Sequence, residues 1–294
     1  MDEDIERIAE IVAARIRDQL GNVAHAPAAP GDVCPEGGCS GCGQCSSKRP
    51  DDVRAIVGTG AARIAAAPGA GQVASDLAGY IDHTLLKPEA TPDDLKTLCQ
   101  EARRYGFATV CVNSSNVGRC RSLLAGSPVR VCAVVGFPLG AMSPGAKAFE
   151  AREAVRNGAG EIDMVVNIGA LKAGDYAAVS DDIARVVAAS RPAKVKVILE
   201  TGMLSDEEKV VGCTLSKLAG AHFVKTSTGF GKGGATPEDV ALMRRVVGGA
   251  LGVKASGGIR SRQDAERMIA AGANRIGASA SVAIVTGGTA RTAY

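Results

Sequence analysis

Residues 223–256 read FVKTSTGFGKGGATPEDVALMRRVVGGALGVKAS, and this stretch contains the unit that decides the fold. It begins with a short apolar run, Phe223–Lys225, and ends with a second one, Gly252–Ala255. Between the two runs, Thr236-Pro237 precedes a longer segment and is typical of the first residues of a helix. A strand, a helix and another strand in this order predict two parallel strands joined by a helical crossover.

The same alternation extends outward from this unit. Six further apolar runs predict strands, at Gly79–Asp82, Ala108–Val112, Val129–Val135, Ile162–Val166, Val195–Leu199 and Arg275–Gly277. Helix start and stop signals lie between them, at Thr91-Pro92 with Gly106, at Ser205 with Glu208, and at Ser261 with Asp264 before Gly272. Eight such strands favour an α/β fold closed as a (β/α)8 TIM barrel, and the alternative that the alternation allows is an open doubly wound sheet.

The residues before the barrel have a different character. Apolar residues at steps of three and four, from Ile5 to Leu20, predict an amphipathic helix over residues 1–20. Residues 21–50 are rich in Cys, Gly and Pro, lack the apolar mass of a core, and predict a flexible linker. We therefore expect an N-terminal helical extension, this linker, a helical connector over residues 51–76, and the (β/α)8 barrel over residues 77–294.

Charge and composition narrow the class of partner. The 294 residues include 34 Lys and Arg against 31 Asp and Glu, and these charges are interspersed, which argues against a nucleic-acid partner. No apolar run approaches the roughly 18 residues of a membrane span, and the acidic start Met1–Asp4 is unlike a secretory signal. We expect a cytoplasmic protein with a small-molecule substrate and no membrane partner.

Three charged residues interrupt the predicted strands, at Asp163, Lys225 and Lys254. A buried charge costs several kcal/mol unless it is paired, so each residue belongs either to a buried salt bridge or to a site. Lys225 and Lys254 end neighbouring strands about 4.8 Å apart. Like charge and partial burial both lower a lysine pKa and leave some amine able to attack a carbonyl. A carboxylate and a second lysine could then transfer protons, which predicts Schiff-base chemistry.

From about residue 77 onward the chain resembles the deoxyribose-phosphate aldolase family, through the motifs Ile81–Thr84, Glu161–Val165, Lys196–Gly202, Val224–Phe230 and Lys254–Arg260. The resemblance implies that Lys225 forms the Schiff base and that Asp163 and Lys254 transfer protons. It also implies that Lys196 and Glu200 support the site, where a structural ion pair is the alternative. The reaction implied is reversible cleavage of 2-deoxy-D-ribose 5-phosphate to acetaldehyde and D-glyceraldehyde 3-phosphate, without a cofactor. The alternatives are a Schiff-base aldolase for a related sugar phosphate and a non-catalytic barrel that binds phosphosugars.

Two glycine-containing segments predict the phosphate site. Gly257-Gly258 follows the seventh predicted strand, and Gly277 and Ser279 follow the eighth, where barrel enzymes often present backbone N–H groups to a phosphate. Ordinary turn glycines are the alternative. Ala280 stands where many relatives have a second serine. Within the resemblance, Thr84, Thr228 and the terminal Tyr294 are further candidates for substrate binding, and Cys111 either faces the site or is a small buried hydrophobe.

Other cofactor patterns are weaker. Gly229–Gly234 fits a dinucleotide fingerprint, but the following strand ends in Lys254 where an acid is required. A metal-dependent aldolase would need clustered histidines, and His25, His83 and His222 are far apart in sequence.

Two features of the extension stand apart from the chemistry. Cys34, Cys39, Cys42 and Cys45 could hold zinc or an iron–sulfur cluster, and the alternative is a redox-active thiol cluster in the linker. The helix over residues 1–20 resembles the encapsulation helices that carry enzymes into bacterial microcompartments, so a shell protein is a candidate partner. A docking or oligomerisation helix is the alternative, and we expect a homo-oligomer.

Overall fold

The computed structural model describes residues 77–288 and, before them, Ala14 alone. The predicted N-terminal helix, linker, connector and Tyr294 therefore lie outside the described residues. Within residues 77–288, parallel strands pair in sequence order and close into a barrel, because β1 pairs with both β2 and β8. This closure decides for the barrel and against the open sheet. The strands are β1 (Ile81–Leu85), β2 (Thr109–Val112), β3 (Arg130–Val135), β4 (Glu161–Val165), β5 (Lys194–Ile198), β6 (Phe223–Lys225), β7 (Gly252–Ser256) and β8 (Arg275–Ala278).

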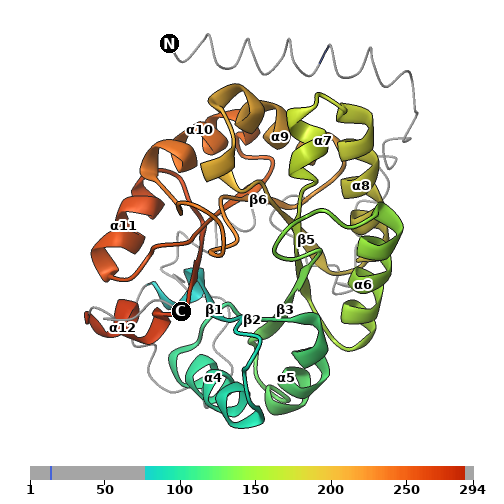
Figure 1. Cartoon of the computed structure of the whole chain (residues 1–294). Helices are drawn as coiled ribbons and strands as arrows, with labels where there is room; N and C mark the ends of the chain where they lie inside the picture. Colours follow the sequence, from blue (N-terminus) through green and yellow to red (C-terminus); the bar gives the residue numbers. More distant parts are fainter. Residues whose placement is uncertain (1–13, 15–76, 289–294) are drawn as a thin grey trace, which may run out of the picture. The chain divides into compact units, whose positions relative to one another are not determined.

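Helices form a ring around the strands (Figure 1). They are α4 (Pro92–Tyr105), α5 (Val117–Leu123), α6 (Pro144–Arg156), α7 (Ile168–Lys172), α8 (Tyr176–Ala189), α9 (Asp206–Leu218), α10 (Pro237–Val247), α11 (Arg262–Ala270) and α12 (Ser281–Thr286). None of these helices, which all lie in residues 77–288, is long and apolar enough to cross a membrane.

The capping signals in the sequence mark helix ends in the structure. Thr91, Ser205 and Ser261 each form a capping box with the acidic residue three positions later, at the starts of α4, α9 and α11. The left-handed conformation of Gly106 ends α4, as a residue without Cβ adopts it most easily. These ends fix the lengths of the crossovers between neighbouring strands.

The first strand lies later in the chain than the sequence pattern predicts. Gly79 and Tyr80 belong to a single turn of 3-10 helix, Ala78–Tyr80, and the Tyr80 N–H donates to the Leu77 carbonyl oxygen at 3.0 Å. Pairing begins only at Ile81, opposite Ile276 of β8, so the predicted strand Gly79–Asp82 is wrong by two residues at its start. An apolar run does not show at which residue strand pairing begins, because that residue is set by the register of β1 with β8 and β2.

Side chains along each strand point alternately to the layer between strands and helices and to the inside of the barrel. Along β4, Ile162 and Met164 belong to the large apolar core, whereas Asp163 between them points to the inside of the barrel. The inside holds a small apolar cluster of Leu86, Cys111, Cys132 and Val134, together with fully buried charged residues such as Lys196 and Lys254. The layer between strands and helices is thus apolar, and the inside of the barrel is largely charged.

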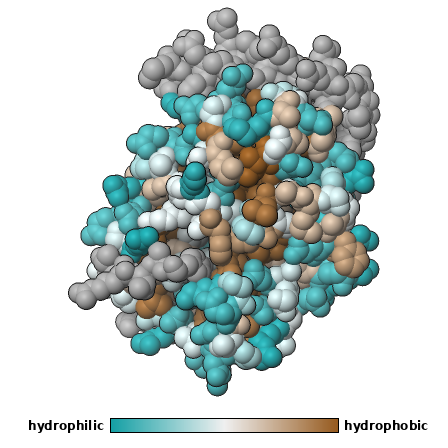
Figure 2. Space-filling model, viewed as in Figure 1, coloured by the Kyte–Doolittle hydropathy of each residue, from teal (hydrophilic) through white to brown (hydrophobic). Residues whose placement is uncertain are grey.

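Some large apolar side chains remain exposed. Leu139 is 74% exposed and Phe149 is 60% exposed, in the segment that runs from the end of β3 into α6. Met142, in the same segment, is 39% exposed. Figure 2 shows apolar residues gathered toward the middle of the face viewed there, with hydrophilic residues around its margin.

Candidate active site

The structure brings Asp163, Lys225 and Lys254 together. Lys225 is the last residue of β6 and lies directly opposite Lys254 of β7 in the strand register. The Nζ atoms of both lysines lie 2.8 Å from the same oxygen, Oδ2 of Asp163. All three side chains are almost completely buried, with Lys225 at 3% exposure. A carboxylate shared by two amines is the arrangement that the sequence predicts.

The second oxygen of Asp163 is also occupied. Lys196 of β5 donates to Oδ1 at 2.7 Å, and the Cys132 thiol of β3 donates to the same oxygen at 3.1 Å. Asp163 therefore accepts four hydrogen bonds from four different strands, which fixes its position at the centre of the barrel.

The charged residues continue around the barrel wall as one network. Lys254 Nζ lies 2.5 Å from Asp82 Oδ2, and Arg275 bridges Asp82 and Glu161 at 2.7 and 2.9 Å. Lys196 Nζ lies 2.6 Å from Glu161. We call the seven side chains the interior charge network: three carboxylates, Asp82, Glu161 and Asp163, and four cations, Lys196, Lys225, Lys254 and Arg275.

Mutual attraction keeps most of this network ionised despite burial. Burial alone would raise the pKa of Asp163, but the neighbouring charges of Lys196, Lys225 and Lys254 outweigh it and hold that pKa well below its ordinary value. Burial alone would lower the pKa of Lys254, yet the carboxylates of Asp163 and Asp82 raise it above its ordinary value. The pKa of Lys196 is raised well above its ordinary value for the same reason. Lys254 and Lys196 are therefore stable ammonium groups at neutral pH.

Lys225 is placed differently from the other two lysines. Lys196 and Lys254 each contact at least two carboxylates, whereas Asp163 is the one carboxylate that pairs with Lys225 among the described residues. With four cations against three carboxylates, the network carries one positive charge in excess when every member is ionised. Of the three lysines in the network, Lys225 has the fewest carboxylate contacts.

A cavity of about 210 Å³ opens above Lys225. Its volume is roughly that of seven molecules of liquid water, which suits a small metabolite. The cavity is lined by Lys225 and by six of the residues predicted to bind substrate: Thr84, Thr228, Gly257, Gly258, Gly277 and Ser279. Arg260 and Ser256 also line it, although the sequence predicts neither of them as a substrate-binding residue. Cys111 and Lys196 are completely buried among the barrel strands.

The loop after β6 is held by Glu200. This residue follows β5 and is the one non-glycine residue in positions 77–288 with a positive φ, 58°. Its Oε2 accepts a hydrogen bond from the Thr228 N–H at 3.2 Å and a very short one from the Thr228 hydroxyl. The Thr228 hydroxyl oxygen in turn accepts from the Phe230 N–H at 3.1 Å. Glu200 therefore shapes the wall of the cavity that Thr228 provides.

Sequence reasoning missed four members of this site and its surroundings. Asp82, Glu161 and Arg275 complete the interior charge network, and Cys132 contacts Asp163. Their signal is present in part, since Asp82 and Glu161 belong to the motifs Ile81–Thr84 and Glu161–Val165, and each adjoins the apolar part of a predicted strand. The four N-terminal cysteines and Tyr294 lie outside the described residues.

The chain is similar to proteins of one aldolase family. The sequence model of the DeoC/LacD family aldolases matches residues 77–288. A deoxyribose-phosphate aldolase of Macrococcus caseolyticus is 57% identical over 219 residues, which cover 74% of this chain and all of that protein. Another, from Brevibacillus brevis, is 60% identical and covers 71% of this chain and 94% of that one. A solved structure described as a tetrameric deoxyribose phosphate aldolase from Aeropyrum pernix is 35% identical, with a TM-score of 0.68 over 79% of this chain and 96% of that one.

Proposed function

The chain belongs to the DeoC/LacD family of aldolases, and we propose that it reversibly cleaves 2-deoxy-D-ribose 5-phosphate to acetaldehyde and D-glyceraldehyde 3-phosphate. The observation that carries the proposal is the position of Lys225 at the cavity, paired with Asp163 alone among the carboxylates of the described residues. The interior charge network supplies the proton chemistry, and the substrate follows from the names of the relatives that match most of this chain.

The first chemical step is imine formation. The unprotonated Lys225 amine attacks the aldehyde carbon of the open-chain sugar, and loss of water from the carbinolamine leaves a protonated imine. Asp163 Oδ2 lies 2.8 Å from Lys225 Nζ and 2.8 Å from Lys254 Nζ, so it can receive a proton from either nitrogen. Lys254, as an ammonium group on the same carboxylate oxygen, is placed to return a proton to the departing hydroxyl.

Carbon–carbon cleavage then uses the imine as the electron sink. A base removes the proton of the C3 hydroxyl, the C2–C3 bond breaks, and its electron pair moves to the iminium to form an enamine. Glyceraldehyde 3-phosphate leaves, a proton returns to C2, and water releases acetaldehyde from Lys225. The iminium accepts the electrons, so this route needs neither a metal ion nor a cofactor.

The phosphate is assigned to the loops after β7 and β8. Gly257 and Gly258 have φ values of 89° and 79°, which suit residues without a Cβ and allow the backbone to approach a ligand closely. A Cβ at Gly257 would lie 3.0 Å from the Gly234 backbone, so this loop is packed against its neighbour. Ser279 offers a hydroxyl, and Arg260 adds the positive charge that a phosphate requires.

A direct assay tests the proposed reaction. The full chain is incubated with deoxyribose 5-phosphate and a panel of related sugar phosphates, and acetaldehyde release is measured. Borohydride is added in parallel with acetaldehyde, and the two-carbon adduct is located by mass spectrometry. We expect release from deoxyribose 5-phosphate and an adduct on Lys225, and neither in Lys225→Ala or Lys225→Arg, because arginine offers no amine nucleophile. An adduct on Lys254 or Lys196 would overturn the assignment, and no adduct at all would favour the non-catalytic barrel.

We also propose that the chain assembles as a homo-oligomer. The exposed Leu139, Met142 and Phe149 lie within one segment, and clustered apolar surface of this kind is typical of a subunit interface. The Aeropyrum pernix relative is described as tetrameric. Sedimentation of the full chain and of Phe149→Lys tests the proposal, which predicts a smaller species for the variant.

For the N-terminal extension we propose a targeting role that is separate from catalysis. The family match begins at residue 77, after the predicted helix, linker and connector. A chain lacking residues 1–70 should keep aldolase activity and lose co-sedimentation with microcompartment shells. Loss of activity would instead make the extension part of the catalytic unit. Elemental analysis of anaerobically purified protein tests whether Cys34, Cys39, Cys42 and Cys45 bind zinc or iron, and a metal-free protein would refute that binding.

A further inference from the structure

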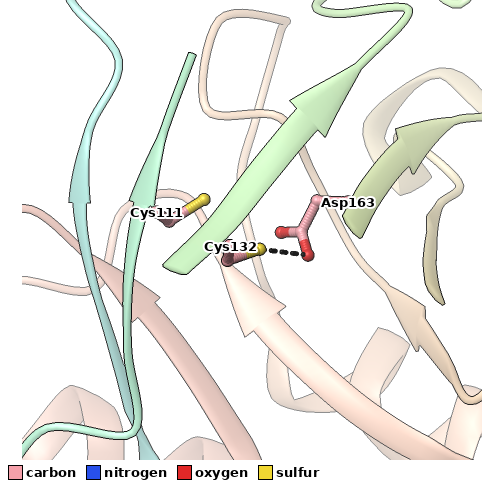
Figure 3. Close-up of side chains that lie close together, drawn as sticks. All are labelled: Cys111, Cys132 and Asp163. Carbon is pink, nitrogen blue, oxygen red and sulfur yellow. Dashed lines mark hydrogen bonds between the residues drawn. The ribbon is translucent and has the colours of Figure 1, made fainter. Parts of the chain in front are cut away.

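Two buried thiols lie beside the catalytic carboxylate. Cys111 of β2 and Cys132 of β3 are direct partners in the parallel strand register, and both are fully buried. Their Sγ atoms and a carboxylate oxygen of Asp163 all lie within 4.8 Å of one another. Figure 3 shows the two sulfur atoms on neighbouring strands, with the Cys132 thiol hydrogen-bonded to Asp163.

The neighbouring lysines argue against a metal ion between these three residues. Lys196 Nζ already contacts two of them, at 2.7 Å from Asp163 Oδ1 and 3.3 Å from Cys132 Sγ. Lys254 Nζ lies 2.8 Å from the other oxygen of the same carboxylate. A divalent cation would meet two ammonium groups at close range, so chemistry between the two thiols is favoured over metal binding.

The strand geometry permits a bond between the two sulfur atoms. Register partners on neighbouring strands have Cα atoms about 4.8 Å apart, inside the range of about 4.4 to 6.8 Å found for disulfides. Both side chains point to the inside of a closed barrel, where curvature brings Cβ atoms closer together than Cα atoms. A disulfide therefore needs rotation of side chains and little movement of the backbone.

The two thiols differ in reactivity. The neighbouring Cys132 side chain, together with the charges of Lys254 and Lys225, lowers the pKa of Cys111 despite its burial. Burial, the neighbouring Cys111 side chain and the Asp163 charge raise the pKa of Cys132 well above its ordinary value. Cys111 is thus the more acidic of the two thiols, and Cys132 is the thiol that would resolve an oxidised partner. Leu86 lines the cavity and packs in the same cluster as both cysteines. A route for a peroxide from the cavity to the two thiols therefore passes this side chain.

We propose that Cys111 and Cys132 form a reversible disulfide when the protein meets a peroxide, and that this bond switches off the site around Asp163. The thiolate of Cys111 attacks the peroxide, forms a sulfenic acid and releases hydroxide or alkoxide. The sulfur of Cys132 then displaces the hydroxyl group of that sulfenic acid, which leaves as water with the Cys132 proton, and the disulfide forms. The peroxide is reduced by two electrons and the thiol pair is oxidised by two.

The effect on the site follows from one hydrogen bond. Cys132 donates its thiol proton to Asp163 Oδ1 at 3.1 Å, and a disulfide sulfur has no proton to donate. The sulfur must also move toward Cys111 and away from Lys196, which contacts it at 3.3 Å. Asp163 therefore loses a partner that fixes its position. This inference rests on the proposed role of Asp163 in proton transfer, and we expect activity to fall by about tenfold or more in the linked protein.

Peptide mapping of the full chain tests the proposal. The reduced protein is treated with hydrogen peroxide, thiols that remain are blocked, and the chain is digested with trypsin. The peptides 105–119 and 131–147 each carry one of the two cysteines. We expect them as a linked pair, two hydrogens lighter than the separate peptides, in a yield that follows the loss of aldolase activity. Dithiothreitol should restore both the separate peptides and the activity.

Two variants sharpen the comparison. In Cys132→Ala the resolving thiol is absent, so Cys111 should proceed to acids that dithiothreitol does not reduce, and lost activity should not return. Cys120→Ala is the matched control, because Cys99 and Cys120 form another buried thiol pair between α4 and α5, away from Asp163. That variant should inactivate and recover as the parent chain does, each protein being compared with its own activity before oxidation.

Two results would overturn the proposal: activity that is lost and recovered without the linked peptide pair, or the linked pair with activity unchanged. Peptide masses report the disulfide whether or not the chain cleaves deoxyribose phosphate. Borohydride trapping with acetaldehyde at Lys225 gives a second readout of the site. A failure of the disulfide is thus distinguishable from a failure of the proposed reaction.

Discussion

Replacement of Lys254 by methionine tests whether one buried ammonium group keeps its neighbour reactive. The Nζ atoms of Lys225 and Lys254 each lie 2.8 Å from Asp163 Oδ2, so they are at most about twice that distance, roughly 5.6 Å, apart. Two unit charges at this separation repel by about 3 kcal/mol at an effective dielectric constant of about 20. Because about 1.4 kcal/mol corresponds to a factor of ten, loss of Lys254 should slow attack by the Lys225 amine by about a hundredfold at neutral pH.

The assay is the rate of imine trapping. Acetaldehyde and cyanoborohydride are added at a series of pH values from about 6 to 10, and the two-carbon adduct at Lys225 is counted by mass spectrometry. Trapping in Lys254→Met should be about a hundredfold slower than in the parent chain at pH 7, and should recover in part as the pH rises.

Lys147→Met provides a matched control. Lys147 of α6 is also a completely buried lysine, paired with Asp182 at 2.6 Å, but it has no contact with Asp163. Its removal leaves a buried carboxylate unpaired and should cost stability without altering the pH dependence of trapping. Trapping at pH 7 in Lys254→Met that stays within about twofold of the parent rate would refute the repulsion argument. A slow rate that does not recover at high pH would assign Lys254 to proton donation alone.

Three further changes address other parts of the site. Asp163→Asn should still form some imine with acetaldehyde and yet lose about 10² to 10⁴ in turnover, and equal losses in trapping and turnover would argue against a proton-transfer role. Glu200→Gln should raise KM by about tenfold with a smaller change in kcat, because it weakens a hydrogen bond to Thr228 at the cavity wall, and a fall in kcat alone in steady-state kinetics would contradict this. The pKa of Asp82 is lowered from 3.8 in the folded protein, because the charges of Lys254, Lys196 and Arg275 outweigh the effect of burial. The ion pairs of Asp82 therefore stabilise the barrel above about pH 4, and this stabilisation is lost as the pH falls toward the pKa of the folded state. Urea unfolding should therefore show that Asp82→Asn is less stable than the parent chain at pH 7 and that the gap narrows below pH 4, whereas a gap independent of pH would be inconsistent with the lowered pKa.

The sequence predicted what depends on local pattern and missed what depends on closure of the barrel. Short apolar runs and capping signals located the strands and helices, and Lys225 and Lys254 were placed together because consecutive strands are neighbours. The pairing of Arg275 with Asp82 joins residues 193 positions apart and exists only because β8 returns to β1. The left-handed backbone of Glu200 gives no local signal, because glutamate is not a residue type that favours a positive φ. The predicted metal site and the predicted targeting helix lie in residues 1–50, outside residues 77–288, so both stay predictions.

The order of the interior charges along the chain has a consequence for assembly of the barrel itself. Strands β1 to β4 supply every carboxylate of the interior charge network, and β5 to β8 supply every cation. A chain divided between β4 and β5 would give two half-barrels with interiors of opposite sign. Two copies of the same half would bring like charges together in a poorly solvated space, whereas unlike halves would neutralise one another. The charged residues of the site thus also favour pairing of the β1–β4 half with the β5–β8 half over pairing of two identical halves.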